Sequence, residues 1–397
     1  MSFVLGVVIF VLALLISIML HEAGHFFTAK KFHMKVTQFF VGFGQTLWSR
    51  RRGETEYGVK ALPLGGFVKI TGMTTLDEVD PADEPRSFRR QPGWQRVIVL
   101  VAGSFMHFAL AFVLLFILAV GIGVPSSASS TTIGSISKCL PSNVHQYNTG
   151  TCPAGAAGSP AQAAGIRAGD KVVSIAGRPV SSWTQLSDVI RAQPAGKPVP
   201  VVVDRDGRQL SLTVTPGSID GRKGSYLGIE AKLFQRVGPV SGVTYAGSTF
   251  GQVMVLSAEA AAKLPSALPD LFASDRSHTA GANVSSIFGA ADDAGQIVQA
   301  GGGWQVTVSA LLLIVISLNI FVGAFNLLPL LPLDGGHLAI VIYERVRAWL
   351  ARLRGRPDPG LVDMQKLIPV SVGVFALLVG LGLILIAADI VNPVHLT

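Results

Sequence analysis

Two histidines and a glutamate near the amino terminus are the first residues whose types and spacing could do chemistry. Residues 21–25 read His-Glu-Ala-Gly-His, which is the H-E-x-x-H pattern. Residues four apart share one face of a helix, so His21 and His25 can both reach one metal ion. Glu22 is then placed to take a proton from water. Because a zinc ion with three protein ligands keeps a position for water and lowers its pKa to about 7, the pattern predicts a hydrolytic zinc site.

The surroundings of this pattern make it more specific than five residues alone. It directly follows Phe3–Leu20, an uncharged apolar run long enough to span a bilayer as a helix. Ionisable residues at the end of a membrane helix are costly, and they indicate a functional site. The alternatives are that they mark the watery end of the helix, or that the run is a cleaved signal peptide. The run lacks the basic region and the small-residue cleavage pattern of a signal peptide.

The third metal ligand must come from a histidine or a carboxylate, because two cysteines are too few for a thiolate zinc module. An extended form of the pattern has a histidine six residues after the second one, where this chain has Lys31. His33 is off that spacing and is interpreted as an ordinary polar residue. Asp334 is the better candidate, because a carboxylate at the end of an apolar run is costly unless it is paired or holds a cation. His337 remains a competing ligand.

Two asparagines in the same distant segment carry amide groups that could serve the site. Asn326 could hydrogen-bond a substrate backbone or a developing oxyanion, or it could join two helices, and the sequence leaves both open. For Asn319, hydrogen bonding between helices is the favoured interpretation.

Composition places these residues in a membrane protein. The 397 residues are 49% hydrophobic and 14% charged, and the mean hydropathy is +0.50, which is unusual for a soluble chain. The formal charge of +8 does not indicate nucleic-acid binding, because the basic residues flank apolar runs, where they anchor and orient membrane helices.

Four apolar runs predict four membrane-spanning helices: Phe3–Leu20, Val97–Val124, Leu311–Leu333 (entered from Trp304) and Leu367–Ala388. Lysines and arginines gather after the first run and before the fourth, so these segments are expected in the cytoplasm. Both termini and residues 125–303 are then expected outside. Cys139 and Cys152 fall in that outer stretch, where a disulfide persists, and we predict that they form one.

The segments between the spans predict two further structures. Turn residues divide Val36–Phe40, Thr46–Ser49, Glu56–Ala61 and Gly66–Thr71 into short strands of a small cytoplasmic sheet. Farther on, the patterns predict a strand, a helix and a hairpin in a small β-rich domain, over Lys171–Ile175, Trp183–Ala192, Val199–Asp204 and Gln209–Thr215.

At these residues the chain resembles the site-2 protease family of intramembrane metalloproteases, and its actinobacterial members in particular. The resemblance combines the pattern at residues 21–25 with Asn326 and the Leu-Asp-Gly-Gly at residues 333–336. It also includes Gly-Glu-Thr-Glu-Tyr at residues 53–57 and Pro-Leu-Gly-Gly-Phe-Val-Lys at residues 63–69. The chain departs from the family at residues 101–107, where a Gly-Pro and an Asn are usual.

The resemblance implies a Zn²⁺ cofactor held by His21, His25 and Asp334, with Glu22 as the general base. It implies that a re-entrant β-loop near residues 56–70, which includes Gly65 and Gly66, helps to present substrate. It further implies a PDZ-like module at residues 160–234, with Tyr226, Leu227 and Gly228 in its carboxylate-binding loop. The expected substrates are single-pass membrane proteins such as anti-sigma factors, cut within the membrane after a prior site-1 cleavage.

The expected fold is therefore a polytopic α-helical membrane protein with four transmembrane helices, a small cytoplasmic or re-entrant β-sheet and one extracytoplasmic PDZ-like α/β domain. The expected segments are transmembrane helices at 1–29, 97–124, 304–334 and 367–390, the β segment at 30–96, the linker with the PDZ-like domain at 125–235, a membrane-proximal region at 236–303 and a cytoplasmic loop at 335–366. Two rival functions are a non-enzymatic membrane scaffold and a membrane-tethered zincin that acts on soluble proteins.

Overall fold

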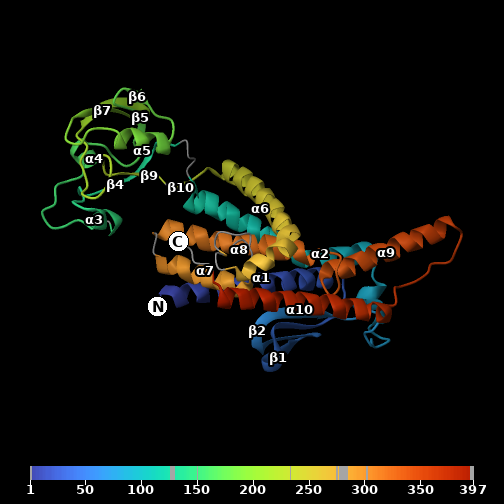
Figure 1. The fold of residues 1–397 in the computed structure, drawn as a ribbon. Helices are drawn as coiled ribbons and strands as arrows, with labels where there is room; N and C mark the ends of the chain where they lie inside the picture. Colours follow the sequence, from blue (N-terminus) through green and yellow to red (C-terminus); the bar gives the residue numbers. More distant parts are fainter. Residues whose placement is uncertain are drawn as a thin grey trace. The chain divides into compact units, whose positions relative to one another are not determined.

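The computed structural model describes residues 2–125, 130–149, 151–232, 234–273, 276, 285–300 and 303–393. The chain divides into two compact units (Figure 1). Unit 1 comprises Met1–Ala119 and Gly238–Thr397, and unit 2 comprises Val120–Val237.

Unit 1 is built on long apolar helices. Within the described residues, 4 helices are long and apolar enough to cross a membrane, over Ser2–Lys31, Gly93–Ile122, Trp304–Asn326 and Met364–Val391. These are the segments in which the sequence predicts spans, and the protein is a multi-pass membrane protein. Three of them, α1 (Ser2–Lys31), α2 (Gly93–Ile117) and α8 (Trp304–Asn326), pack on one another.

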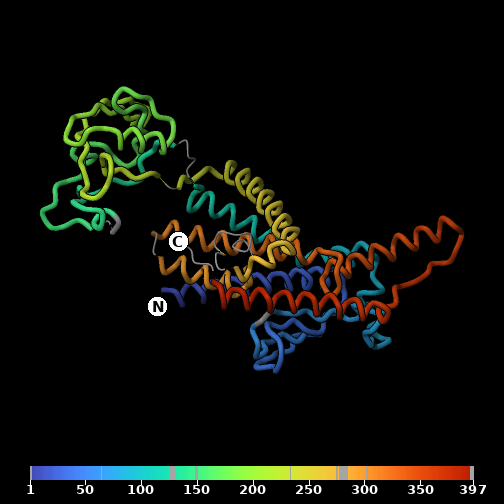
Figure 2. Tube along the Cα trace, viewed as in Figure 1, coloured from blue at the N-terminus to red at the C-terminus, as the bar shows by residue number. Residues whose placement is uncertain are grey.

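The fourth span, α10 (Ile368–Val391), reaches the bundle through α7 (Ile287–Ala300). Asp389 near the end of α10 accepts a hydrogen bond from the backbone N–H of Ser286, just before α7. At the other end of the chain, Phe3 of α1 packs against Gly295 of α7. The start of α1 and the end of α10 therefore lie at the same end of the bundle (Figure 2).

Two further helices of unit 1 differ from the sequence-based expectation. Helix α6 (Pro239–Ala267) runs for 29 residues through the predicted membrane-proximal region, and α9 (Asp334–Leu353) fills much of the predicted cytoplasmic loop. The third span ends at Asn326, not at Leu333. Residues 343–353 of α9 are rich in Arg, Ala and Leu, which favour helix without making an apolar run, so a search for apolar runs overlooks them.

The sheet of unit 1 contains two long antiparallel strands, β1 (Val36–Arg52) and β2 (Thr55–Ile70), in place of four separate short ones. Each strand folds over on itself, because Phe39 pairs with both Tyr57 and Val68. The four predicted segments are thus the halves of these strands. Across the sheet, the halves lie in the order 46–52, 55–60, 36–41 and 66–70. Gly42 has a positive φ of 85° at the bend of β1, so a glycine there bends the strand without ending it.

Sheet and helices share one apolar core in unit 1. Phe26 of α1, Val36 and Ile70 of the sheet, Val99 of α2 and Val341 of α9 belong to a single buried cluster. This core fixes the relative positions of the four elements that carry the candidate site.

Unit 2 is a small α/β unit with its own core. A four-stranded sheet has the order β6-β5-β7-β8, made of β5 (Lys171–Ile175), β6 (Arg178–Pro179), β7 (Val199–Arg205) and β8 (Arg208–Val214). Helix α5 (Trp183–Arg191) buries Leu186 and Ile190 against this sheet. These elements coincide closely with the strand, helix and hairpin that the sequence predicts. A second pair joins β4 (Ile133–Ile136) to β9 (Ile229–Ala231).

Candidate metal centre

Helix α1 presents both histidines of the H-E-x-x-H pattern on its buried face. His21 and His25 are one turn apart and are 8% and 5% exposed, so the pair is largely removed from water. Gly24 lies between them at the contact with α2, where a Cβ would stand 2.5 Å from the carbonyl oxygen of Ala102. The glycine of the pattern thus allows close approach of the two helices, as small residues do in membrane proteins.

Asp334 reaches the histidines from the first turn of α9, at the end of the irregular segment 327–333. The two glycines that follow it pack on that segment. A Cβ on Gly335 would stand 2.2 Å from the Leu328 carbonyl oxygen, and one on Gly336 would stand 2.6 Å from the Leu331 nitrogen. Only glycine fits at either position, and this packing holds the start of α9, with its aspartate, against the preceding loop.

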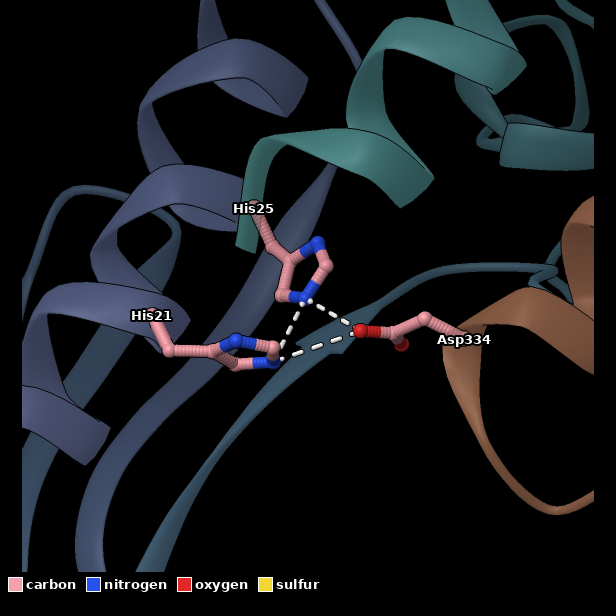
Figure 3. Close-up of side chains that lie close together, drawn as sticks. All are labelled: His21, His25 and Asp334. Atoms are coloured by element: carbon pink, nitrogen blue, oxygen red, sulfur yellow. Dashed lines mark hydrogen bonds and ion pairs between the residues drawn. The ribbon is translucent and has the colours of Figure 1, made fainter. Parts of the chain in front are cut away.

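The three side chains converge on one point (Figure 3). The Nε2 atoms of His21 and His25 are 3.1 Å apart. Oδ2 of Asp334 lies 3.3 Å from the first and 3.2 Å from the second. Among the described residues, this is the group of histidine, cysteine and carboxylate side chains that could hold a metal ion.

The donor set fits a zinc ion. Ligand atoms about 2.0–2.1 Å from zinc at tetrahedral angles lie about 3.3 Å from one another, close to the spacing of these three atoms. Oδ2 of Asp334 is buried and has no hydrogen-bond partner among the described residues, which is costly unless a cation is nearby. Nδ1 of His25 lies 2.7 Å from the Val99 carbonyl oxygen. It therefore donates its hydrogen there, which leaves a lone pair on Nε2 for the metal.

Helix α2 leaves room at the centre by means of a glycine. A Cβ on Gly103 would stand 2.4 Å from Nε2 of His25 and 2.7 Å from Nε2 of His21, in the space between the inward nitrogens. Any larger residue at position 103 would collide with the two imidazoles and displace them.

Glu22 lies on the side of α1 that faces the sheet. A Cβ on Gly66 of β2 would stand 3.3 Å from Cγ of Glu22. The glutamate therefore lies against the 66–70 half of β2, on the helix that carries both histidines.

Ion pairs at the ends of the membrane helices brace the elements that carry the site. Arg96 at the start of α2 pairs with Glu344 of α9 at 2.9 Å, with both side chains about nine-tenths buried. Glu54, in the turn between β1 and β2, accepts hydrogen bonds from Arg86 and from Lys30 at the end of α1. The Arg86 guanidinium, together with Lys30, holds the pKa of Glu54 at about 2, so this brace is ionised at neutral pH.

The other predicted site residues are not members of the metal-binding group. Asn326 ends α8, and Gly65 and Gly66 lie inside β2. Tyr226, Leu227 and Gly228 belong to unit 2, where they precede β9. The competing ligand His337 is not in the metal-binding group; it lines a separate small pocket with Met73 and Glu344.

Unit 2 carries a pocket beside the predicted carboxylate-binding loop. A cavity of about 450 Å³ is lined by Tyr226, Ser137, Tyr147 and Glu230. The Cys139 and Cys152 sulfurs, at the base of the segment that carries Tyr147, are bonded in a disulfide.

Sequence reasoning assigned no role at the metal centre to Gly103, Ser17 or His107. The packing of α1 on α2 brings Gly103 and His107 against the two histidines, and Ser17 lies one turn before His21. Two signals were available: a histidine inside a predicted membrane span, where such residues are rare, and the departure from the family at residues 101–107.

Comparisons with known proteins agree with this geometry. The model of peptidase family M50 matches residues 9–356, which include all three residues of the metal-binding group. The zinc metalloprotease Rip1 of Mycobacterium tuberculosis is 39% identical over the whole of both chains. Rip1 of Mycolicibacterium smegmatis is 36% identical, again over both complete chains.

A more distant relative comes from another bacterial group. The regulator of sigma-E protease RseP of Salmonella typhimurium is 28% identical, over 85% of this chain and 90% of its own length. The family match covers most of the chain, and the Rip1 relatives align from end to end. We conclude that this chain belongs to peptidase family M50, the site-2 protease family.

Proposed function

We propose that this protein is a zinc metalloprotease of the site-2 type, which hydrolyses peptide bonds within transmembrane segments of other membrane proteins. The family match and the relatives named as zinc metalloproteases support the activity and the cofactor. One observation carries the proposal: two histidines of a membrane-spanning helix and an aspartate meet at 3.1–3.3 Å in a buried site. A non-enzymatic scaffold would have no use for this arrangement.

We assign the zinc ion to His21, His25 and Asp334. When bound, zinc supplies Lewis acidity, which lowers the pKa of water and polarises a peptide carbonyl. Glu22 takes the proton from the attacking water and delivers it to the leaving amine, as the general base and then the general acid. Its place beside Gly66 of the sheet supports this role, because a peptide lying along the sheet would pass close to the carboxylate.

The substrate must be extended before it is cut, because the carbonyl groups of a helix are hydrogen-bonded within the helix. We propose that the unwound segment adds to the 66–70 half of β2 as an extra strand, by β-augmentation. This half lies at the edge of the sheet, and it includes Gly66, against which Glu22 lies. Gly66 lets this half of β2 pack closely on Glu22, because a Cβ there would stand 3.3 Å from Cγ of Glu22. We propose that Gly65 and Gly66 contact the substrate and that the Asn326 amide donates to its carbonyl.

We further propose that unit 2 is a PDZ-like domain in which Tyr226, Leu227 and Gly228 form the carboxylate-binding loop. The strand that follows the loop, the adjacent helix α5 and the nearby cavity support this interpretation. The substrates would be single-pass membrane proteins such as anti-sigma factors, after a first protease has shortened them outside the membrane. The name of the RseP relative, a regulator of sigma-E, supports that class.

Cells provide the test of this function. The expected result is that membrane proteins shortened outside the membrane accumulate when the chain carries Glu22→Gln, and disappear when the active protein is restored. Quantitative proteomics of membrane fractions would detect these fragments. If the same fragments are present in equal amounts with the active and the inactive protein, the proposed function is wrong.

We propose that both termini and unit 2 lie outside the cell membrane, while residues 50–52 and 352–356 lie in the cytoplasm. The concentration of arginines in the two cytoplasmic segments supports this orientation. Packing of the start of α1 and the end of α10 against α7 agrees with termini on one side. Reporter fusions after residue 200 should then signal an external location, and a cytoplasmic signal there would overturn the topology.

The disulfide between Cys139 and Cys152 is expected to form in the cell, since an outer location is oxidising. By restricting the unfolded chain, closure of this short loop stabilises unit 2 by roughly 3 kcal/mol. Alkylation of unreduced protein followed by mass spectrometry should find no free thiol, and two after reduction. Two labelled cysteines before reduction would contradict the prediction.

A further inference from the structure

The two histidines of the metal centre are supported in different ways. Nδ1 of His25 donates to the Val99 carbonyl oxygen at 2.7 Å, the usual way of orienting a ligating imidazole. Nδ1 of His21 is buried and has no hydrogen-bond partner among the described residues. Something other than a hydrogen bond must hold the His21 ring in place.

The ring that packs on His21 from helix α2 is His107. The centroids of the two rings are 4.9 Å apart, and the ring planes are tilted by 42°. His107 is one turn beyond Gly103, the glycine that leaves room for the ligands, and it is 3% exposed. The imidazole of His107 therefore forms part of the wall against which His21 lies.

His107 is itself held by a hydrogen-bonded network that joins three helices. Its Nδ1 lies 2.8 Å from Oδ1 of Asn319 on α8. The amide nitrogen of Asn319 donates both of its hydrogens, one to Oγ of Ser17 on α1 at 3.0 Å and one to the carbonyl oxygen of Val315 at 2.8 Å. The acceptor Oδ1 is thus left for His107, so the hydrogen of His107 is on Nδ1.

This network is placed where it can act on the metal centre. Ser17 precedes His21 by one helical turn, and Ser17 and Asn319 are only 2% and 1% exposed. A satisfied polar network in a dry interior rigidifies its surroundings, because breaking one bond leaves buried groups without partners. The sequence favours a role for Asn319 in hydrogen bonding between helices. The structure adds that this hydrogen bonding also orders the surroundings of His21, a proposed metal ligand.

We propose that His107 is a positioning residue for the metal centre, and that its ring, fixed by Asn319, orients the His21 imidazole in place of a hydrogen bond. The inference rests on the proposed metal site. It predicts that replacing either His107 or Asn319 weakens metal binding, because the His21 ring is then no longer held in place. Neither substitution removes a metal ligand.

Cobalt binding to the purified full-length protein in detergent tests this role, because the visible absorption of cobalt reports ligand geometry independently of activity. Four proteins suffice beside the wild type: His107→Ala, Asn319→Ala, the double variant and Ser309→Ala. Ser309 is a matched control, since it is a buried serine of α8 whose hydroxyl has no partner among the described residues. Size-exclusion chromatography and thermal unfolding first establish that each protein is folded.

We expect His107→Ala to lower the affinity for cobalt by about 10- to 100-fold and to shift its absorption bands, as loss of an outer support of a metal ligand does. Asn319→Ala should have an effect in the same direction, and the double variant should lose little more than His107→Ala alone, because coupled residues are not additive. Ser309→Ala should bind as the wild type does. If His107→Ala fails to fold, the Asn319→Ala spectrum decides.

Wild-type affinity and spectrum in a folded His107→Ala or Asn319→Ala protein would overturn the role of His107 and leave the proposed protease intact. Effects of the two substitutions that simply add would also overturn it. If the wild-type protein does not bind one cobalt ion, the metal site itself is wrong, and both proposals fall together.

Discussion

Replacing Glu22 with glutamine is expected to leave zinc bound at one ion per protein while proteolysis falls by at least about 10²–10⁴-fold, the contribution typical of a general base. The reason is geometric. The three atoms that converge at 3.1–3.3 Å come from His21, His25 and Asp334, and Glu22 is not in that group. Its side chain lies against Gly66 of the sheet, where substrate and water would meet.

Glutamine retains the size of glutamate but cannot accept a proton at neutral pH, so the substitution separates chemistry from packing. The measurement is the initial rate of cleavage of a model single-span substrate in detergent or liposomes, with zinc determined on the same samples. Glu259→Gln is a suitable control, because this exposed residue on α6 forms its ion pair, within the part of the chain that the structure describes, with Lys263 four residues away. Unchanged cleavage by Glu22→Gln would remove Glu22 from the mechanism.

Replacing Asp334 with alanine is expected to abolish zinc binding and proteolysis together. Two imidazoles alone make a weak site, and a lost ligand should weaken zinc affinity by at least about 100-fold, since loss of an outer partner already costs up to that much. The substitution also removes the buried Oδ2 that lacks a hydrogen-bond partner among the described residues. Without metal, the variant no longer buries a carboxylate in an apolar interior, so folding should be retained.

Zinc content by mass spectrometry after dialysis, together with thermal unfolding, measures this effect. Asp188→Ala, on an exposed face of α5 in unit 2, controls for the loss of a carboxylate elsewhere. If Asp334→Ala retains full zinc while Glu22→Gln loses it, the roles of the two carboxylates are reversed.

How much of the fold and of the metal centre could be predicted from the sequence depends on how far apart in the chain the interacting residues lie. His21 and His25 are four residues apart on one helix, so their shared face follows from helix geometry alone. The apolar runs likewise predict the four spans, because length and hydropathy are local properties. Asp334 is harder, since it is more than three hundred residues away; its placement at the end of an apolar run was the physical signal.

Other parts depend on contacts that no local pattern encodes. Pro63 and the two glycines after it are turn signals, yet β2 continues through them, because the strand bends there while it pairs with β1. The pair Gly335 and Gly336 suggests broken backbone, but both lie in the first turn of α9, packed against residues 327–331. In each case the glycines allow two segments to pack closely. The sequence alone does not show which segments meet.

The same limit applies to the surroundings of the metal. Gly103 and His107 act through α2, and their importance appears only when α2 is packed on α1. Sequence identifies atoms that can bind zinc, whereas the packed structure identifies the residues that leave space for it and orient the ligands.

The position of the scissile bond tests the central claim most directly. A single-span substrate, tagged on both sides and reconstituted with the purified protein in liposomes, can be recovered after cleavage and its new ends determined by mass spectrometry. The account predicts new termini inside the apolar span, produced by the wild-type protein and absent with Glu22→Gln. New termini only in the soluble flanks, or the same intramembrane ends with Glu22→Gln, would contradict an intramembrane protease built on this metal centre.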